Sequence, residues 1–387
     1  MRGSPSLLGR VAAFLVAGAA VWTGCEGDPE VTTSPDGPTS GIGGGNPHGG
    51  NGAAGGAGGA DGAGGAMGAV EPVRVGVIAN TASSTPAPGD LALAELTAFA
   101  SGVRAVSVEL RWRDIHAAAI DALAARVDDY VERDLAVVLD LSIVDGHADL
   151  RPDAVIAEAW NAAATKSALS ASIAAVLAAT DGDLAAVVLG RRVDAYLAEH
   201  PADQQALTEL ISEGLEQLAA AGVPQGVGLT HLGDNADVAY RGLAALGSIT
   251  TLAYLPGLGL EQVPVDVSHA KALDQMIDLA DGRPIVLQAA GYPSAVEIGS
   301  SEDEQAQQLD GMFAALEPRR SAFPVVVVKQ LHDLDEDACT ALVAAQGLDP
   351  GDPLGTHLCS TGLRGVDGAA KPAYTRFLQA AAHFATP

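Results

Sequence analysis

Eight short apolar runs, rich in β-branched residues, recur along residues 73–387 and alternate with longer segments rich in alanine and leucine. Runs that are apolar on both faces are typical of parallel strands covered by helices, so each run predicts a buried strand. The runs occupy residues 73–79, 105–110, 136–143, 185–189, 226–230, 249–254, 284–287 and 324–328.

The segments between these runs carry the spacing of helices. In residues 203–220, leucine and isoleucine recur at intervals of three and four positions, which places them on one helical face. Asp203 stands where an N-cap is expected, and Gly222 follows the last apolar position. Eight units of strand and helix predict an α/β fold, a single (β/α)₈ TIM barrel. A dinucleotide-binding sheet is disfavoured, because residues 80–84, which follow the first run, contain no glycine.

The first 25 residues resemble an export signal. A positive start is followed by an apolar stretch over residues 11–21 that is too short to span a bilayer, and small residues precede Cys25 as in a bacterial lipobox. We expect residues 1–24 to be a lipoprotein signal peptide and Cys25 to carry the lipid. Ordinary cleavage near Gly24, without lipidation, is the alternative.

The next segment, residues 25–70, is dominated by glycine and alanine and shows no apolar periodicity. Such a composition predicts a disordered stalk that holds the third segment, residues 71–387, away from its anchor. Together with the signal, the stalk predicts a lipid-anchored protein of the cell envelope, at the periplasmic face or the cell surface.

The net charge of the chain limits the classes of partner, and its cysteine content indicates a disulfide. The chain has 48 acidic and 21 basic residues and a net charge of −27, which disfavours nucleic acid as a partner. Apart from Cys25, the cysteines are Cys339 and Cys359. In an exported protein this pair predicts a disulfide rather than a metal site, which needs more ligands. We expect no cofactor and a monomer.

In a barrel of this kind the functional side chains lie at the carboxyl ends of the strands. Several aromatic, cationic and amide side chains follow the predicted strands at this end. The candidates for ligand binding are Trp112, Arg191, Arg192, Tyr254, Gln288, Tyr292, Lys329 and His332.

Two of these strand ends and the C-terminal tail carry a family resemblance. Residues 189–197, LGRRVDAYL, are similar to the LGNEVDxYL segment of retaining (β/α)₈ glycoside hydrolases, and residues 289–294, AAGYPS, resemble their ExGYPS segment. The tail from Cys359 to Ala373 is similar to the barrel-closing end of the same group. The resemblance covers about residues 73–380 and implies a barrel built to hold a sugar.

This sequence departs from the family pattern at the two positions that carry the catalytic glutamates. The resemblance gives the general acid/base position to Arg192 and the nucleophile position to Ala289, so both glutamates are replaced. Retaining hydrolysis needs two carboxyl groups about 5–5.5 Å apart. Alanine offers no nucleophile, and a guanidinium stays protonated, so the sequence predicts that the ancestral reaction is lost.

Binding can outlast the loss of chemistry. Trp112, Tyr254 and Tyr292 are candidates for sugar stacking, although Tyr292 also suits packing of the turn before Pro293. Arg191, Arg192 and Lys329 form either a positive cluster for a carboxylated or sulfated glycan, or ion pairs with acids such as Asp194 and Asp333.

Three functional readings follow from these residues. The first is a non-catalytic barrel that binds carbohydrate or another surface ligand. The second is an active hydrolase with relocated carboxylates, drawn from acids near the strand ends: Glu109, Asp140, Asp145, Asp194 and Asp333. The third is a scaffold or adhesion module that binds no sugar.

Overall fold

The computed structural model describes residues 72–231 and 238–386, which belong to one compact unit, Ala69–Pro387. The predicted signal peptide, the lipidated Cys25 and the predicted stalk lie outside the described residues. Within the described part of the chain, no helix is long and apolar enough to cross a membrane.

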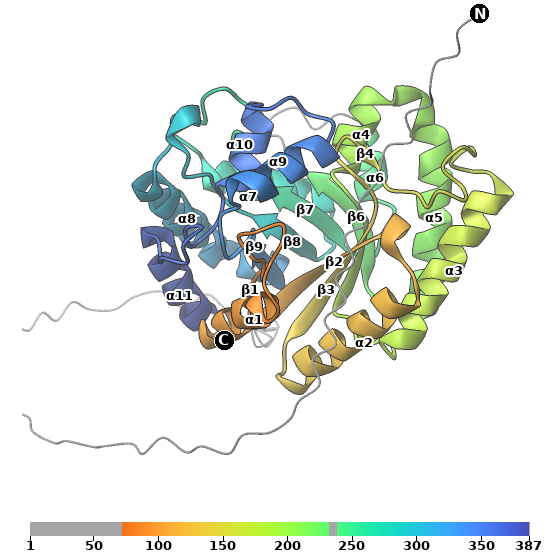
Figure 1. Ribbon diagram of the computed structural model, residues 1–387, viewed down its shortest axis with the longest axis horizontal. Coiled ribbons are helices and arrows are strands. Elements are labelled where there is room, and N and C mark those ends of the chain that lie inside the picture. The colour runs from red at the N-terminus through yellow and green to blue at the C-terminus, as the bar shows by residue number, and fades with distance from the viewer. Residues whose placement is uncertain (1–71, 232–237, 387) are drawn as a thin grey trace, which may run out of the picture. The chain divides into compact units, whose positions relative to one another are not determined.

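Eight parallel strands among the described residues close into a barrel, because β2 pairs with both β1 and β3 while β9 pairs with β1 and β8 (Figure 1). A short strand, β4, pairs antiparallel with the end of β3. The strands are β1 Arg74–Val77, β2 Ala105–Arg111, β3 Ala136–Asp145, β4 Ala148–Asp149, β5 Ala186–Arg191, β6 Gln225–Thr230, β7 Thr250–Tyr254, β8 Ile285–Ala290 and β9 Val325–Val328.

The predicted (β/α)₈ barrel is therefore confirmed, and each predicted apolar run is a barrel strand. Four strands extend beyond their predicted ends: β2 reaches Arg111, β3 Asp145, β5 Arg191 and β8 Ala290. The runs predicted for β3 and β8 end too early because the polar residues Asp145 and Gln288 interrupt the apolar pattern. Both are nevertheless buried residues of their strands.

Helices connect the strands and cover the outside of the barrel (Figure 1). They are α1 Asp90–Ala100, α2 Ala117–Glu132, α3 Ala163–Ala179, α4 Val193–Glu199, α5 Gln204–Ala220, α6 Val238–Ala244, α7 His269–Ala280, α8 Glu302–Leu316, α9 Glu336–Ala345, α10 Pro353–Cys359 and α11 Pro372–Phe384.

The helix predicted over residues 203–220 is α5, but its expected cap works differently. The Asp203 side chain makes no capping hydrogen bond to the helix. Its Oδ2 instead accepts hydrogen bonds from Trp160 Nε1 at 3.1 Å and from the Tyr196 hydroxyl at 3.0 Å. The carboxylate therefore joins α5 to the segments before it.

The core has two layers because successive strand residues point to opposite sides. On β3, Val137 and Leu139 pack outward against the helices, whereas Ala136 and Val138 belong to the cluster inside the barrel. That inner cluster consists of alanine, valine and isoleucine side chains, which are small enough to fill a closed eight-stranded barrel.

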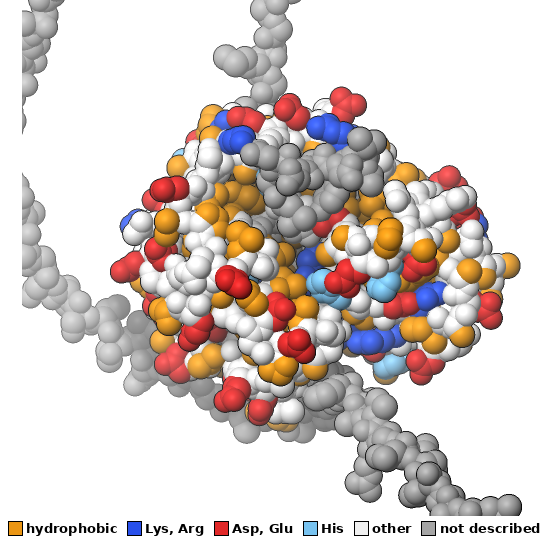
Figure 2. All heavy atoms as spheres, turned by 90° about the horizontal axis from the view of Figure 1, so that it is seen from above, with side chains coloured by type: hydrophobic (Ala, Val, Ile, Leu, Met, Phe, Trp, Pro, Cys, Tyr) orange, Lys and Arg blue, Asp and Glu red, His pale blue; other side chains and the backbone are white. Residues whose placement is uncertain are grey.

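The predicted disulfide is confirmed between Cys339 on α9 and Cys359 at the end of α10, with Cα atoms 5.6 Å apart. Both helices follow β9 and lie at the top of the domain in Figure 1, together with α4 and β4. Figure 2 looks onto this end of the barrel, where acidic side chains are scattered among apolar and uncharged ones.

Candidate functional site

A cavity of about 170 Å³ lies at the carboxyl ends of the strands, where a barrel of this type places its function. Its walls come from most of the barrel strands and from Leu342 on α9 and Leu358 on α10. The volume is below the range of about 300–1,000 Å³ typical of pockets for drug-sized ligands. It would hold about five or six water molecules at roughly 30 Å³ each, so this cavity accepts only a small ligand.

One guanidinium links three strands across the cavity. Arg191, the last residue of β5, places Nη1 at 2.6 Å from Glu109 Oε2 on β2. Its Nε lies 3.2 Å from Asp140 Oδ2 on β3, and its Nη1 lies 3.8 Å from Asp145 Oδ2. Burial alone would raise the pKa of Glu109, but the charges of Arg191 and Arg111 outweigh burial and hold that pKa below its usual range.

Arg192 closes a second polar ring. Its Nε and Nη2 donate to Asp145 Oδ1 at 3.2 and 3.0 Å, and its Nη2 also donates to Gln346 Oε1 at 2.6 Å. Gln346 Nε2 in turn donates to Asp145 Oδ2 at 3.0 Å. All three side chains are buried. The backbone of Arg192 is left-handed, with φ of 47°, which is uncommon for a residue other than glycine.

Two carboxyl groups on β3 respond in opposite ways to the same surroundings. Burial would raise the pKa of Asp145, but the charges of Arg191 and Arg192 outweigh it, and the pKa falls well below its usual range. Burial dominates at Asp140 and raises its pKa well above the usual value, despite Arg191 and a hydrogen bond from Ser142 Oγ. Asp140 therefore holds a proton more tightly than an exposed aspartate does.

Lys329 follows β9 and is the cation of the cavity that lacks a carboxylate partner. No Asp or Glu oxygen of the described residues lies within 4.0 Å of its Nζ, which donates to Gln330 Oε1 at 3.5 Å. The side chain is buried, with 8% of its surface exposed. Burial, reinforced by the charges of Arg191 and Arg192, lowers the pKa of Lys329 to about 7.

The end of β8 contributes one apolar and one polar wall. Ala289 lines the cavity and leaves space where a longer side chain would project. Gln288 is 3% exposed, and within the described residues its Oε1 has no hydrogen-bond donor. Gly228 on β6 allows this packing, since a Cβ there would lie 3.0 Å from Gln288 Nε2 and still closer to the Gly190 carbonyl. An unpaired buried acceptor favours a ligand that can donate a hydrogen bond.

The structure brings together part of the predicted site. The residues from the prediction that line this one cavity are Arg191, Arg192, Gln288, Ala289 and Lys329. The two arginines are neutralised, as the alternative of ion pairing predicted, but by Glu109, Asp140 and Asp145. The acids expected for that role lie elsewhere: Asp194 accepts from the Thr230 amide, and Asp333 pairs with Lys371 at 2.5 Å.

The predicted aromatic platform is absent from this cavity, whose lining within the described residues includes no Trp, Tyr or Phe. Trp112 is fully buried and donates from Nε1 to Ser172 Oγ at 3.0 Å. Tyr254 is buried against His269, with 2.8 Å between its hydroxyl and Nδ1. The Tyr292 hydroxyl donates to the Pro264 carbonyl at 2.9 Å, so this side chain packs its turn.

His332 also lies outside the lining of the cavity. Its amide donates to Asn80 Oδ1 at 3.0 Å, and burial lowers the pKa of its ring. The sequence reasoning missed Gln346, which contacts both Arg192 and Asp145, because it follows α9 and carries no pattern that points to the barrel mouth.

A second hollow of about 510 Å³ adjoins the first, and Leu255 lines both. Its walls come from the segment after β7 and from α7, and include Tyr254, Pro256, Leu260 and Lys271. Across the described ranges, no group of three or more His, Cys, Asp or Glu side chains is placed to hold a metal ion.

No family model and no curated protein sequence matches this chain. Among solved structures, a GH5_18 protein from Streptomyces cattleya in complex with GlcNAc is similar over 82% of this chain and 81% of its own, with a TM-score of 0.62 and 18% identity. A variant of that protein in complex with Manb1-4GlcNAc matches 80% of each chain, with a TM-score of 0.61 and 18% identity.

An exo-beta-1,4-mannosidase from Opitutaceae bacterium strain TAV5 is similar over 81% of this chain and 59% of its own, with a TM-score of 0.59 and 15% identity. At these identities the likeness shows the fold alone: this chain forms a closed eight-stranded parallel barrel, as the proteins similar to it do.

Proposed function

We propose that this chain is a lipid-anchored protein of the cell envelope whose barrel binds a carbohydrate without hydrolysing it. The observation that carries the proposal is that Arg192 and Ala289 line the same cavity at the barrel mouth. These are the two positions to which the sequence resemblance assigns the catalytic glutamates. A cavity that keeps its place but lacks both carboxylates is suited to binding.

The lost chemistry follows from the residues present. A retaining mechanism needs a nucleophile and an acid/base group on opposite sides of the scissile bond. Ala289 has no atom that can attack, and the guanidinium of Arg192, which Asp145 and Gln346 hold in place, offers neither a general acid nor a general base. Loss of both members of a catalytic pair removes most of the rate enhancement, because such groups act as a unit.

Relocated carboxylates are a weaker explanation of the site. Glu109 and Asp145 are both tied to guanidinium groups, which lowers their affinity for a proton and makes each a poor base. Asp140 is the best candidate acid of the cavity lining, since burial raises its pKa. The hydrolase alternative therefore depends on Asp140 and lacks an unpaired carboxylate partner in the cavity lining.

The nature of the ligand follows from the size and polarity of the hollows. The cavity of about 170 Å³ has room for one small polar group, and the hollow of about 510 Å³ beyond Leu255 gives a bound sugar space to continue. Proteins of similar fold hold GlcNAc and Manb1-4GlcNAc. Since Arg191 and Arg192 are already paired, a neutral sugar suits this site better than a carboxylated or sulfated one.

A glycan array probed with the purified full chain tests binding. We expect retention on neutral glycans, and we expect Gln288→Met to weaken it by at least tenfold, because the unpaired Oε1 is removed from the cavity. Gln379→Met is the matched control, since Gln379 is exposed on α11. Binding to no glycan would overturn the proposal in favour of a scaffold or adhesion module.

Turnover assays on β-glucan, galactan, mannan and Manβ1-4GlcNAc separate binding from hydrolysis. We expect no release of sugar by the full chain. Turnover that disappears in Asp140→Asn would establish the hydrolase alternative and contradict the proposal.

Mass spectrometry of the N-terminal peptide from membranes of expressing bacteria tests the anchor. We expect an acylated Cys25, and we expect Cys25→Ser to release the protein from the membrane fraction. A wild-type protein cleaved near Gly24 without acylation would refute the anchor and leave the proposal for the barrel intact.

A further inference from the structure

Lys329 is placed as a reactive amine. It follows β9 at the barrel mouth, its side chain lines the cavity, and only 8% of its surface is exposed. Two other lysines have carboxylate partners: Lys166 pairs with Glu213 and Lys371 with Asp333, each at 2.5 Å. Within the described residues, no Asp or Glu oxygen lies within 4.0 Å of Lys329 Nζ.

The groups around Lys329 favour its neutral form. Burial is the largest influence and lowers the pKa to about 7, and the positive charges of Arg191 and Arg192 act in the same direction. Asp145 and Glu109 oppose them, but each is already engaged with an arginine. A neutral lysine amine is a nucleophile, and desolvation beside other cations is how proteins activate one. The charged and titratable groups that face Lys329 or line its cavity are Glu109, Arg111, Asp140, Asp145, Arg191, Arg192 and His357.

We propose that Lys329 binds a small hydroxyaldehyde or hydroxyketone covalently, as an imine formed in the barrel cavity. The amine nitrogen adds to the carbonyl carbon and gives a carbinolamine. Loss of one water molecule then forms the carbon–nitrogen double bond, so that amine and carbonyl compound yield imine and water, with no oxidant or reductant required.

The cavity itself favours this class of ligand. Its volume of about 170 Å³ admits a compound of a few carbon atoms near the amine. Gln288 Oε1 is buried without a donor, and a ligand hydroxyl would supply one. Asp140 on β3 lines the same cavity, and burial raises its pKa, so it is the group suited to give a proton to the departing hydroxyl. Imine formation goes beyond the proposed glycan binding and does not require it.

Reductive trapping tests the proposal on the wild-type full chain. The protein is incubated with glyceraldehyde and sodium cyanoborohydride, then reduced at its disulfide and digested with trypsin. Trypsin does not cleave after an alkylated lysine, so labelled Lys329 gives a peptide of residues 321–364, whereas unlabelled protein gives residues 321–329. The chain has four lysines, and each can be followed separately.

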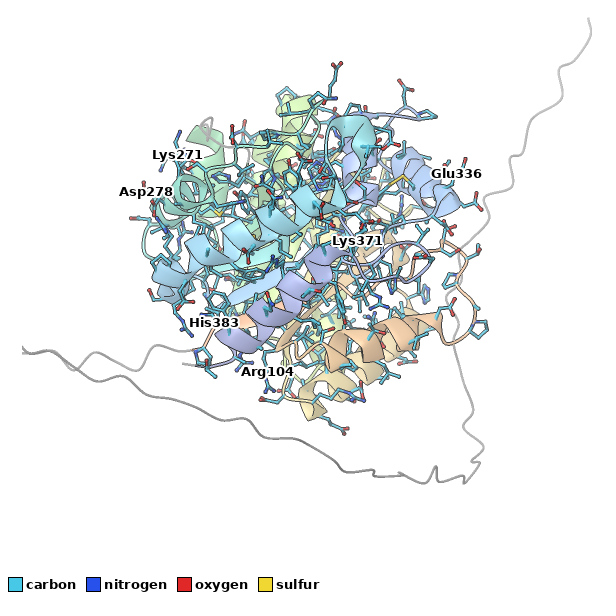
Figure 3. All side chains as sticks on the ribbon, turned by 90° about the vertical axis from the view of Figure 1, so that its left-hand side faces the viewer. Arg104, Lys271, Asp278, Glu336, Lys371 and His383 are labelled. Carbon is cyan, nitrogen blue, oxygen red and sulfur yellow. A yellow bond between two sulfur atoms is a disulfide. The ribbon has the colours of Figure 1, made fainter. Side chains whose placement is uncertain are left out.

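We expect Lys329 to be trapped at least tenfold faster at neutral pH than Lys166 or Lys271; Lys271 projects from the edge of the domain in Figure 3. The rate of trapping should rise with pH with a midpoint near 7, the pKa of Lys329. Chain unfolded in urea gives the baseline at which the lysines react alike. Trapping at Lys329 no faster than at Lys166 would overturn the proposal.

A variant that keeps the amine separates cavity chemistry from general reactivity. Ala289→Leu fills part of the cavity and leaves Lys329 in place, so we expect trapping at Lys329 to fall at least tenfold while circular dichroism stays that of the folded chain. Lys166→Arg is the control and should leave trapping at Lys329 unchanged. Undiminished trapping in folded Ala289→Leu would contradict an imine formed in the cavity. Neither result bears on the glycan array, so the two proposals fail separately.

Discussion

Arg192 Nη2 lies 3.0 Å from Asp145 Oδ1, and both side chains are buried at the mouth of the barrel. The pair joins the end of β5 to the end of β3, and Gln346 completes it from the segment after α9. Because each charge is withdrawn from water, each depends on the other for its stability in the folded chain.

Arg192→Ala should therefore be strongly destabilising. Removing one member of a buried pair leaves the other uncompensated, and the expected loss is about 3–5 kcal/mol in the free energy of unfolding, measured by urea denaturation. Arg319→Ala is the matched control, because its partner Asp274 is 58% exposed and surface pairs contribute about 0–1 kcal/mol. Equal losses in the two variants would contradict the buried pair.

The two aspartates of β3 should respond differently to the same substitution. Asp145→Asn removes a charge that Arg192 and Arg191 require, and we expect a loss of about 3 kcal/mol or more at pH 7. Asp140→Asn should cost less, because burial raises the pKa of Asp140 and so opposes its charged form, whereas the pKa of Asp145 is lowered. Thermal unfolding of both variants at pH 7 compares their stabilities. A greater loss of stability in Asp140→Asn would contradict the opposite pKa shifts of the two aspartates.

The stability of the protein should fall with acid because of His357. Burial and the charge of Lys329 lower the pKa of this histidine to about 3, below its unfolded value of about 6.5. Between these values the unfolded chain takes up a proton that the folded chain does not. Protonation of His357 in the unfolded chain therefore lowers the free energy of unfolding by about 1.4 kcal/mol for each pH unit as the pH falls from about 6 toward the folded pKa.

His357→Leu removes the group that takes up this proton. It should flatten the fall in the free energy of unfolding between pH 6 and pH 4, as measured by urea denaturation at each pH. His383→Gln is the control because His383 lies at the surface beside Glu317, and it should leave the slope nearly as it is in the wild type. An unchanged slope in His357→Leu would show that another group carries the acid sensitivity.

Reduction of the disulfide should destabilise the domain. Cys339 and Cys359 are 20 residues apart, and closing a loop of that length stabilises a protein by about 3 kcal/mol through the unfolded chain. We expect dithiothreitol to lower the melting temperature of the wild type. It should have no effect on a variant with both cysteines changed to serine, which starts from the lower value.

The fold was predictable from sequence because apolar runs of strand length and helical spacing between them are local properties. The eight barrel strands follow the predicted runs closely, the short β4 was not predicted, and the differences lie near the carboxyl ends of strands, at residues such as Asp145 and Gln288. There, polar side chains belong to buried strands, and a pattern of hydrophobicity alone ends the strand too early.

The site was less predictable because position at a strand end does not fix where a side chain points. Trp112, Tyr254 and Tyr292 were expected at the mouth, yet each turns into a packed layer and satisfies its polar atom there. The partners of Arg191 lie 46 to 82 positions earlier in the chain, and Gln346 lies 154 positions after Arg192. Such pairings depend on the tertiary structure.

The ring formed by Arg192, Asp145 and Gln346 also limits how this sequence can evolve. A glutamate at position 192 alone would face Asp145 across a buried space and leave Gln346 between two anions. Any lineage that moved from the present arrangement toward a carboxylate at position 192 would first pass through a poorly stable protein, unless position 145 changed as well. Substitutions at positions 145 and 192 are therefore epistatic: each is disfavoured alone and becomes tolerable only in combination with the other.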